Sequence, residues 1–259
     1  MNYINKIEDK FIYKCFIAIL MFMFMLEGTT WNEFNDSLLH DILLIFCLTL
    51  ALLLFAKYII ENRYSIKELI IVISLCSMGV ICYISSGYTG LFITVLAAVL
   101  VPENSLDEVL KLLFYEEVIL LAMIIIASQM GVLQNKIIEI NKGMYVTEAS
   151  ALGFSHPNML GAQATSIVFL YLCKARNNLK INNILVVALA ITVIYFFSRS
   201  RISMLLGVGV VILIALRKIE YIKKFVFSIL PWMNIIVITM LIVFMGMYVL
   251  LGSDSPVVK

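Results

Sequence analysis

Nine apolar stretches divide this chain of 259 residues, and they constrain its fold more than any other feature. Hydrophobic residues make up 63% of the sequence and charged residues 14%. An α-helix needs about 20 mostly apolar residues to cross a bilayer. Backbone groups in lipid must be satisfied internally, and these stretches lack the alternation of a barrel strand. The sequence therefore predicts an all-α fold, a polytopic bundle of about nine transmembrane helices.

The predicted bundle forms one transmembrane domain over residues 1–259, with the N-terminus in the cytoplasm. Its spans are Phe11–Leu26, Leu38–Ile60, Glu68–Ile84, Tyr88–Val101, Leu112–Leu133, Phe154–Leu172, Ile184–Phe197, Ile202–Leu216 and Phe225–Leu251. With this orientation, 14 of the 19 Lys and Arg residues fall on the cytoplasmic side. The outer side holds only Lys136, Lys142, Arg199, Arg201 and Lys259. Such a split follows the positive-inside rule.

Composition narrows the classes of function. The basic residues serve topology, so the net charge of +2 does not indicate a nucleic-acid partner, and we expect none. The five cysteines lie in or beside predicted spans, which fits packing residues rather than external disulfides. There is no CxxC, no metal-ligand cluster and no Gly-rich phosphate loop. We therefore expect no metal site and no cofactor.

Small residues are expected to mark close contacts between helices, as they do in membrane bundles. The positions with this pattern are Gly161 in one predicted helix and Ser203, Gly207 and Gly209 in another. Easier packing is their simplest role, and direct contact with a substrate is the alternative.

The first polar element on the predicted outer side is the loop from Gln134 to Asn158. It ends in GFSHPNMLG, directly before a predicted span. Pro157 suits a first helical turn, with Ser155 or His156 near the cap. Capping accounts for Ser, Pro and Asn here but not for a histidine. His156 is either a polar interfacial residue or a functional one that accepts a proton or donates a hydrogen bond.

The second polar element is the turn FSRSRIS, which joins two predicted spans. Its two arginines, Arg199 and Arg201, lie on the outer side, where topology gives no reason for them. A guanidinium group matches phosphate oxygens with two parallel hydrogen bonds, and serine hydroxyls add donors. The alternative is an arginine pair that reaches lipid head groups.

The stretch ALGFSHPNMLGAQATSIVFLYL, followed by YFFSRSRISMLLGVGVVIL, resembles the O-antigen ligase and oligosaccharide repeat-unit polymerase (Wzy-type) family of bacterial envelopes. In that family a GF-x-HPN-x-x-G element opens one helix and an SR-S element opens another soon after. The motifs cover roughly residues 150–215, and the rest is similar only in hydropathy and span order. The matching positions are Gly153, His156, Pro157, Asn158 and Gly161, then Ser198, Arg199 and Ser200.

The resemblance implies a glycosyltransferase at the outer face of the bacterial cytoplasmic membrane. The donor would be a glycan on a polyprenyl diphosphate, and the acceptor a second lipid-linked repeat unit. His156 would take the acceptor's proton, and Arg199 would stabilise the leaving diphosphate. The substrate-binding set would be Arg199, Arg201, Ser198, Ser200 and Asn158. Implied partners are the lipid-linked oligosaccharide, membrane lipids and other polysaccharide-assembly proteins.

A lipid-linked oligosaccharide flippase, or another polytopic transporter, is the alternative function. Transporters often contain internal repeats and charges at mid-membrane. The halves of this chain show no such repeat, and its polar elements lie at the predicted outer edge, which favours the polymerase. Members of the resembled family usually continue into a large external loop, and no residue here matches it. We therefore expect the chain to be an N-terminal portion that ends before that loop.

Overall fold

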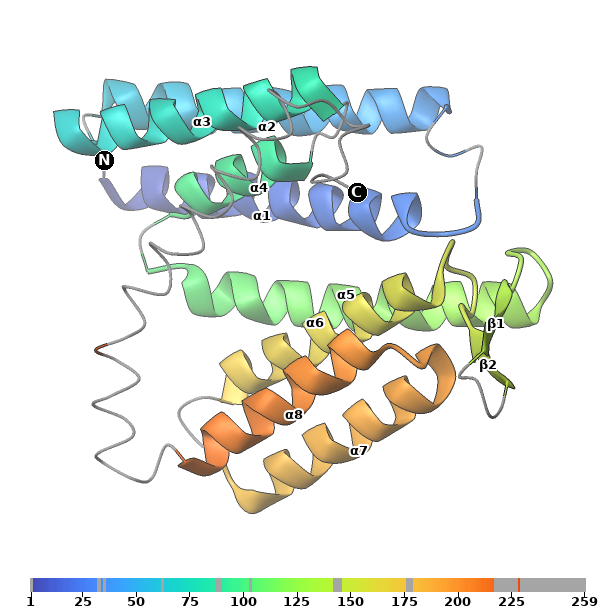
Figure 1. Cartoon of the computed structure of the whole chain (residues 1–259). Coiled ribbons are helices and arrows are strands. Elements are labelled where there is room, and N and C mark those ends of the chain that lie inside the picture. The colour runs from blue at the N-terminus through green and yellow to red at the C-terminus, as the bar shows by residue number, and fades with distance from the viewer. Residues whose placement is uncertain are drawn as a thin grey trace. The chain divides into compact units, whose positions relative to one another are not determined.

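The computed structural model describes residues 2–216 except 32–33, 35, 62, 87–89, 103, 142–145 and 176–178, together with residue 228. The chain divides into two compact units, Met1–Arg63 with Leu100–Val211, and Tyr64–Val99 with Ile212–Lys259. The elements are α1 (Asn2–Glu27), α2 (Leu38–Ile60), α3 (Ile66–Ser86), α4 (Gly90–Val99), α5 (Leu106–Gln129), β1 (Ile137–Asn141), β2 (Val146–Ser150), α6 (Pro157–Ala175), α7 (Ile181–Ser198) and α8 (Arg201–Leu216) (Figure 1).

The first unit contains helices that pack in sequence on their neighbours. Helix α1 contacts both α2 and α5, α5 contacts α6, and α6 contacts α7. The antiparallel strands β1 and β2 form a hairpin between α5 and α6, and β2 contacts α7 (Figure 1). The hairpin therefore connects two helices of the unit and packs on a third.

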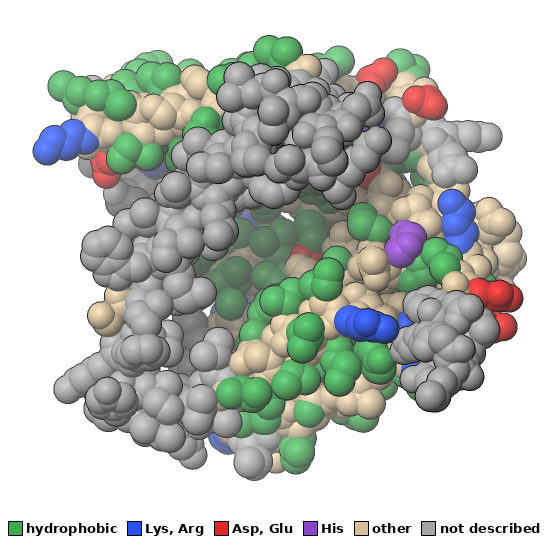
Figure 2. All heavy atoms as spheres, viewed as in Figure 1, with side chains coloured by type: hydrophobic (Ala, Val, Ile, Leu, Met, Phe, Trp, Pro, Cys, Tyr) green, Lys and Arg blue, Asp and Glu red, His purple; other side chains and the backbone are tan. Residues whose placement is uncertain are grey.

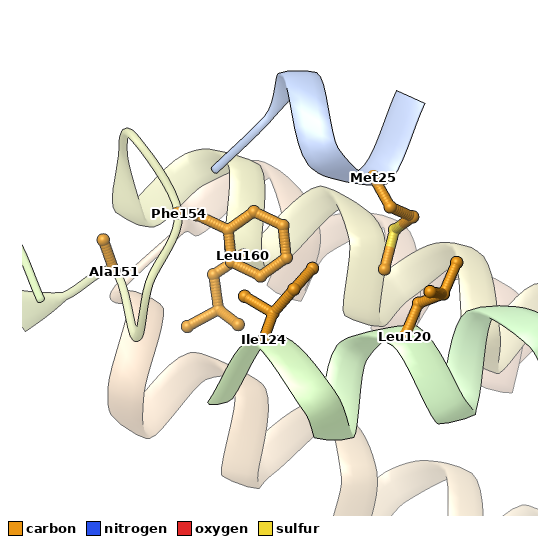
Figure 3. Close-up of a cluster of buried hydrophobic side chains, with 6 residues drawn as sticks. All are labelled: Met25, Leu120, Ile124, Ala151, Phe154 and Leu160. Atoms are coloured by element: carbon orange, nitrogen blue, oxygen red, sulfur yellow. The ribbon is translucent and has the colours of Figure 1, made fainter. Parts of the chain in front are cut away.

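A buried apolar cluster holds the end of α5 against α1 and the start of α6. The side chain of Phe154 is fully buried and packs with Met25, Leu120, Ile124 and Leu160 (Figure 3). Burying a side chain of this size contributes roughly 1.5–3 kcal/mol. The cluster therefore fixes the segment before α6 in place.

At the other end of these helices, charged residues join the first half of α1 to the end of α2 and to the start of α5. The carboxylate of Asp9 is buried between Lys57 and Arg63, both near the end of α2. Lys14 in α1 pairs with Glu108 at the start of α5, with Nζ 2.6 Å from Oε2. The hydrogen bond from Lys14 lowers the pKa of Glu108 below its ordinary value. This end of the first unit is thus held by ion pairs.

The second unit has α3 packed on α4. Gly79 in α3 allows the approach, because a Cβ there would lie 2.7 Å from the Cα of Phe92. The hydroxyl of Tyr64 donates to the carbonyl of Val99 at 3.0 Å and ties the two ends of this helix pair together.

The prediction of an all-α bundle of nine transmembrane spans is wrong. Among the described residues only α2 is both long and apolar enough to cross a membrane. Helix α4 has 10 residues and α8 has 16, which is short against the length that a bilayer requires. Helix α5 is long enough but carries charges, namely Asp107, Glu108, Lys111, Glu116 and Glu117. The fold is mostly helical with a hairpin in a predicted loop, and the predicted span Phe225–Leu251 lies outside the described residues.

Candidate functional site

Gly153 turns the chain from the hairpin toward α6 in a way that requires glycine. Its φ is +94°, in the region that L side chains rarely adopt. A Cβ at this position would also lie 3.1 Å from the carbonyl oxygen of Ile124 and from the Cβ of Ser128. The glycine of the first motif therefore permits close contact with α5.

Backbone hydrogen bonds from the end of α1 hold the next residues of the first motif. The N–H of Ser155 donates to the carbonyl of Gly28 at 2.9 Å, and the N–H of Thr30 donates to the carbonyl of Gly153 at 2.8 Å. Between these bonds, Thr29 and Phe154 form an antiparallel bridge. The segment Gly153–Ser155, directly before His156, is thus held against the end of α1.

His156 caps the N-terminus of α6. Its Nδ1 accepts the backbone N–H of Asn158 at 3.1 Å, and its carbonyl accepts the N–H of Met159 at 2.9 Å. Because Nδ1 is an acceptor, the neutral ring carries its hydrogen on Nε2. The side chain is exposed, and Nε2 has no hydrogen-bond partner among the residues that the structure describes, whereas Nδ1 can take a proton only if the cap bond is lost. The side chain of Asn158 is also exposed and makes no hydrogen bond to any described residue.

Arg199 ends α7 in a left-handed conformation. Its φ and ψ are 51° and 18°, and its N–H donates to the carbonyl of Tyr195 at 2.9 Å. This conformation costs a non-glycine residue about 1–2 kcal/mol, and such strain is concentrated at functional sites. The guanidinium carbon lies 5.1 Å from the ring centre of Phe196. The Nε atom is buried and has no hydrogen-bond partner among the described residues. The cation is therefore fixed in direction and retains free donor capacity.

The serines of the second motif are buried and satisfy one another. Ser198 donates to the carbonyl of Ile194 at 2.8 Å and accepts the N–H of Ser200 at 3.2 Å. Ser200 caps α8, since its Oγ accepts the N–H of Ser203 at 3.4 Å and lies 3.0 Å from the hydroxyl of Ser203. Ser198 and Ser200 therefore shape the turn around Arg199, and their hydroxyls are covered.

The two motifs are in direct contact through Gly161. A Cβ on Gly161 would lie 2.6 Å from Oγ of Ser203, 2.8 Å from Cβ of Ser200 and 3.2 Å from Oγ of Ser198. Only a glycine allows α6 to approach the serine turn this closely. The first motif and the turn that carries Arg199 thus form one packed structure, although about 40 residues separate them in the sequence.

A pocket of about 520 Å³ lies between the hairpin and the end of α7. Arg199 lines it together with Ile137, Thr147, Glu148, Ser150, Phe196 and Phe197. Arg201, the exposed first residue of α8, is not among its lining residues, nor is His156. The described residues bring to this pocket one cation, one carboxylate, two hydroxyls and two aromatic rings, which suits a polar ligand with an anionic group.

Sequence reasoning found Arg199 but missed Glu148 and the strands that carry it. A strand signal was present in the sequence, because β-branched residues (IIEI and VT) flank a short segment that contains Asn141 and Gly143. No family model, curated protein or solved structure matches this chain.

Proposed function

We propose that this protein is a bacterial surface-polysaccharide polymerase. It transfers a polyprenyl-diphosphate-linked glycan to a lipid-linked repeat unit at the outer face of the cytoplasmic membrane. The contact between Gly161 and the serine turn carries this proposal, because the two motifs of the resembled family are separate in sequence and packed together in the fold.

In the proposed reaction, the acceptor hydroxyl attacks the anomeric carbon of the donor. A glycosidic bond forms, the sugar–phosphate bond breaks, and the polyprenyl diphosphate leaves with the bonding electrons. Arg199 stabilises the charge on this leaving group, since its fixed donors need no reorganisation. Arg201 and Asn158 are exposed and contribute at the edge of the site. His156 accepts the acceptor's proton at Nδ1 after its cap bond opens, and its Nε2 donates a hydrogen bond to the substrate.

The apolar surface supports a location at the membrane. Helix α2 is long and apolar enough to cross a membrane, and most of its apolar stretch is exposed. Large apolar side chains along it, including Ile45 and Leu52, are exposed. Hydrophobic side chains also cover much of the visible surface of α7 and α8 (Figure 2). Exposed apolar surface of this extent indicates contact with lipid or another apolar partner. Membrane lipids and other polysaccharide-assembly proteins are the proposed partners.

The charged residues at the two ends of α2 predict which end faces outward. Lys57 and Arg63 lie near its C-terminal end, whereas Asp36 and Asp41 lie near its start, so the start should face outward. With the five native cysteines replaced, Asp36→Cys should react with an impermeant thiol reagent on intact cells. Glu61→Cys should react only after the membrane is opened. The reverse labelling would place both motifs in the cytoplasm and exclude an external reaction.

Substitution of His156 separates its two possible roles. Asparagine is a good cap and can still donate a hydrogen bond, but it cannot take a proton. If His156 accepts the acceptor's proton, His156→Asn and His156→Ala should both lower the rate about a hundredfold or more. A His156→Asn protein with nearly normal polymerisation at matched membrane abundance would remove the residue from proton transfer and leave it a cap and donor.

The reaction can be tested in membranes that contain the protein. Purified lipid-linked repeat units should be converted to products of two or more repeats, with one polyprenyl diphosphate released for each new linkage. A flippase would move the units across the membrane and release no diphosphate. Transport of units without elongation would therefore support the transporter and contradict the polymerase.

A further inference from the structure

The hairpin directs Glu148 toward the same pocket as Arg199. Ile137 pairs with Ser150 and Glu139 with Glu148 in the register of the two strands. Side chains alternate along a strand and directly paired residues share a face, so Ile137, Glu139, Glu148 and Ser150 lie on one face of the hairpin. Of these, Ile137, Glu148 and Ser150 line the pocket, and so does Thr147 from the other face. The contact of β2 with α7, rather than the register alone, thus places this carboxylate in the pocket wall.

The position of Glu148 is unfavourable for the hairpin alone. It lies directly opposite Glu139, and like charges at such a pair of positions destabilise a sheet. Arg199 lines the same pocket, and no ion pair joins it to Glu148 among the described residues. Within the part of the chain that the structure describes, the pocket therefore presents a carboxylate without an ion-pair partner and a guanidinium group with an unused Nε donor.

A ligand that satisfies both groups must carry an anionic group beside hydrogen-bond donors. A sugar attached to a phosphate has this chemistry, because the phosphate suits the guanidinium and the sugar hydroxyls donate to the carboxylate. The rings of Phe196 and Phe197 offer apolar surface for the faces of the sugar. The pocket volume of about 520 Å³ is within the usual range for small-molecule sites.

We propose that Glu148 recognises the hydroxyls of the sugar that is joined to the donor's diphosphate, and so determines which donor the protein accepts. This inference rests on the proposed function, and it adds a specificity residue on the hairpin. Arg199 holds the phosphate, and Glu148 distinguishes a glycosylated phosphate from a bare one.

Binding of small probes to the purified full chain tests the assignment without turnover. The probes are glucose 1-phosphate, galactose 1-phosphate, N-acetylglucosamine 1-phosphate and inorganic phosphate, titrated with detection of the ligand by NMR. At least one sugar 1-phosphate should bind about tenfold more tightly than inorganic phosphate. Glu148→Gln should remove most of this preference, while inorganic phosphate binds equally well or better because a repelling charge is gone. Arg199→Ala should weaken the binding of every probe.

Glu139→Gln is the matched control. It removes the other carboxylate of the same opposed pair, so it changes the charge and the hairpin in the same way, but Glu139 does not line the pocket. The control should keep the preference for the sugar 1-phosphate. Equal preferences in Glu148→Gln and Glu139→Gln, or no sugar 1-phosphate that binds better than inorganic phosphate, would overturn the assignment. Failure of the polymerase proposal itself would instead appear as unchanged polysaccharide length after gene deletion.

Discussion

Replacement of Arg199 by alanine is expected to abolish extension of the polysaccharide, with a loss of about a hundredfold or more in rate. The guanidinium group has an unused buried donor and lines the pocket, so no other described cation there replaces it. Chain length on the cell surface, measured by gel electrophoresis at matched membrane abundance, is the readout. Arg199→Lys should recover only part of the activity, because a point charge cannot reproduce two parallel hydrogen bonds.

Arg199→Asn separates the charge from the fold. Asparagine tolerates the left-handed conformation at the end of α7, so the turn should form normally. It should nevertheless be as inactive as the alanine variant. Wild-type chain length in Arg199→Asn would show that the arginine serves only as a helix cap or a lipid anchor.

Gly161→Ala is expected to destabilise the protein by about 1–3 kcal/mol, because it overpacks the contact between the two motifs. The new Cβ would lie 2.6 Å from Oγ of Ser203 and 2.8 Å from Cβ of Ser200, so α6 or the serine turn must move. The thermal unfolding midpoint in detergent measures this loss. Polymerisation should fall as well, since the displaced turn carries Arg199.

Gly209→Ala is the control for Gly161→Ala. It introduces the same methyl group into α8, where nothing lies within 4 Å of the new Cβ. Alanine is also the better helix former, so Gly209→Ala should leave the unfolding midpoint unchanged or raise it. Equal effects of the two substitutions would mean that the close contact at Gly161 does not hold the motifs together.

Local sequence signals predicted several elements well. The apolar run Leu38–Ile60 is α2 with the same bounds, because Ser37 caps one end and Glu61 follows the other. Pro157 begins α6, as its fixed φ and missing N–H predict. Gly161 and Gly207 do mark close contacts, the latter against Ile191. The bounds of α2 and the start of α6 depend on residues that are neighbours in sequence, whereas for the glycines only the tendency of small residues to mark contacts could be predicted, not the partners.

Features that depend on tertiary contacts could not be predicted in the same way. Hydropathy alone produced nine spans, because it does not register where the helices end, and α4 and α8 have only 10 and 16 residues. At Gly209, by contrast, no described residue lies within 4 Å of where a Cβ would be, so the predicted contact is not found within the described part of the chain. Ser198 and Ser200, two of the residues predicted to bind substrate, are buried and hydrogen-bonded within the turn, which the sequence does not reveal. Whether they also bind substrate stays a prediction.

The polymerase proposal is tested most directly by deletion of the gene in its native host, with analysis of the surface polysaccharide and of the lipid-linked intermediates. We predict that long chains disappear and that single lipid-linked repeat units accumulate at the outer face, with both changes reversed by the wild-type gene and not by Arg199→Asn. An unchanged distribution of chain lengths, or the loss of single repeat units from the outer face, would contradict the proposal.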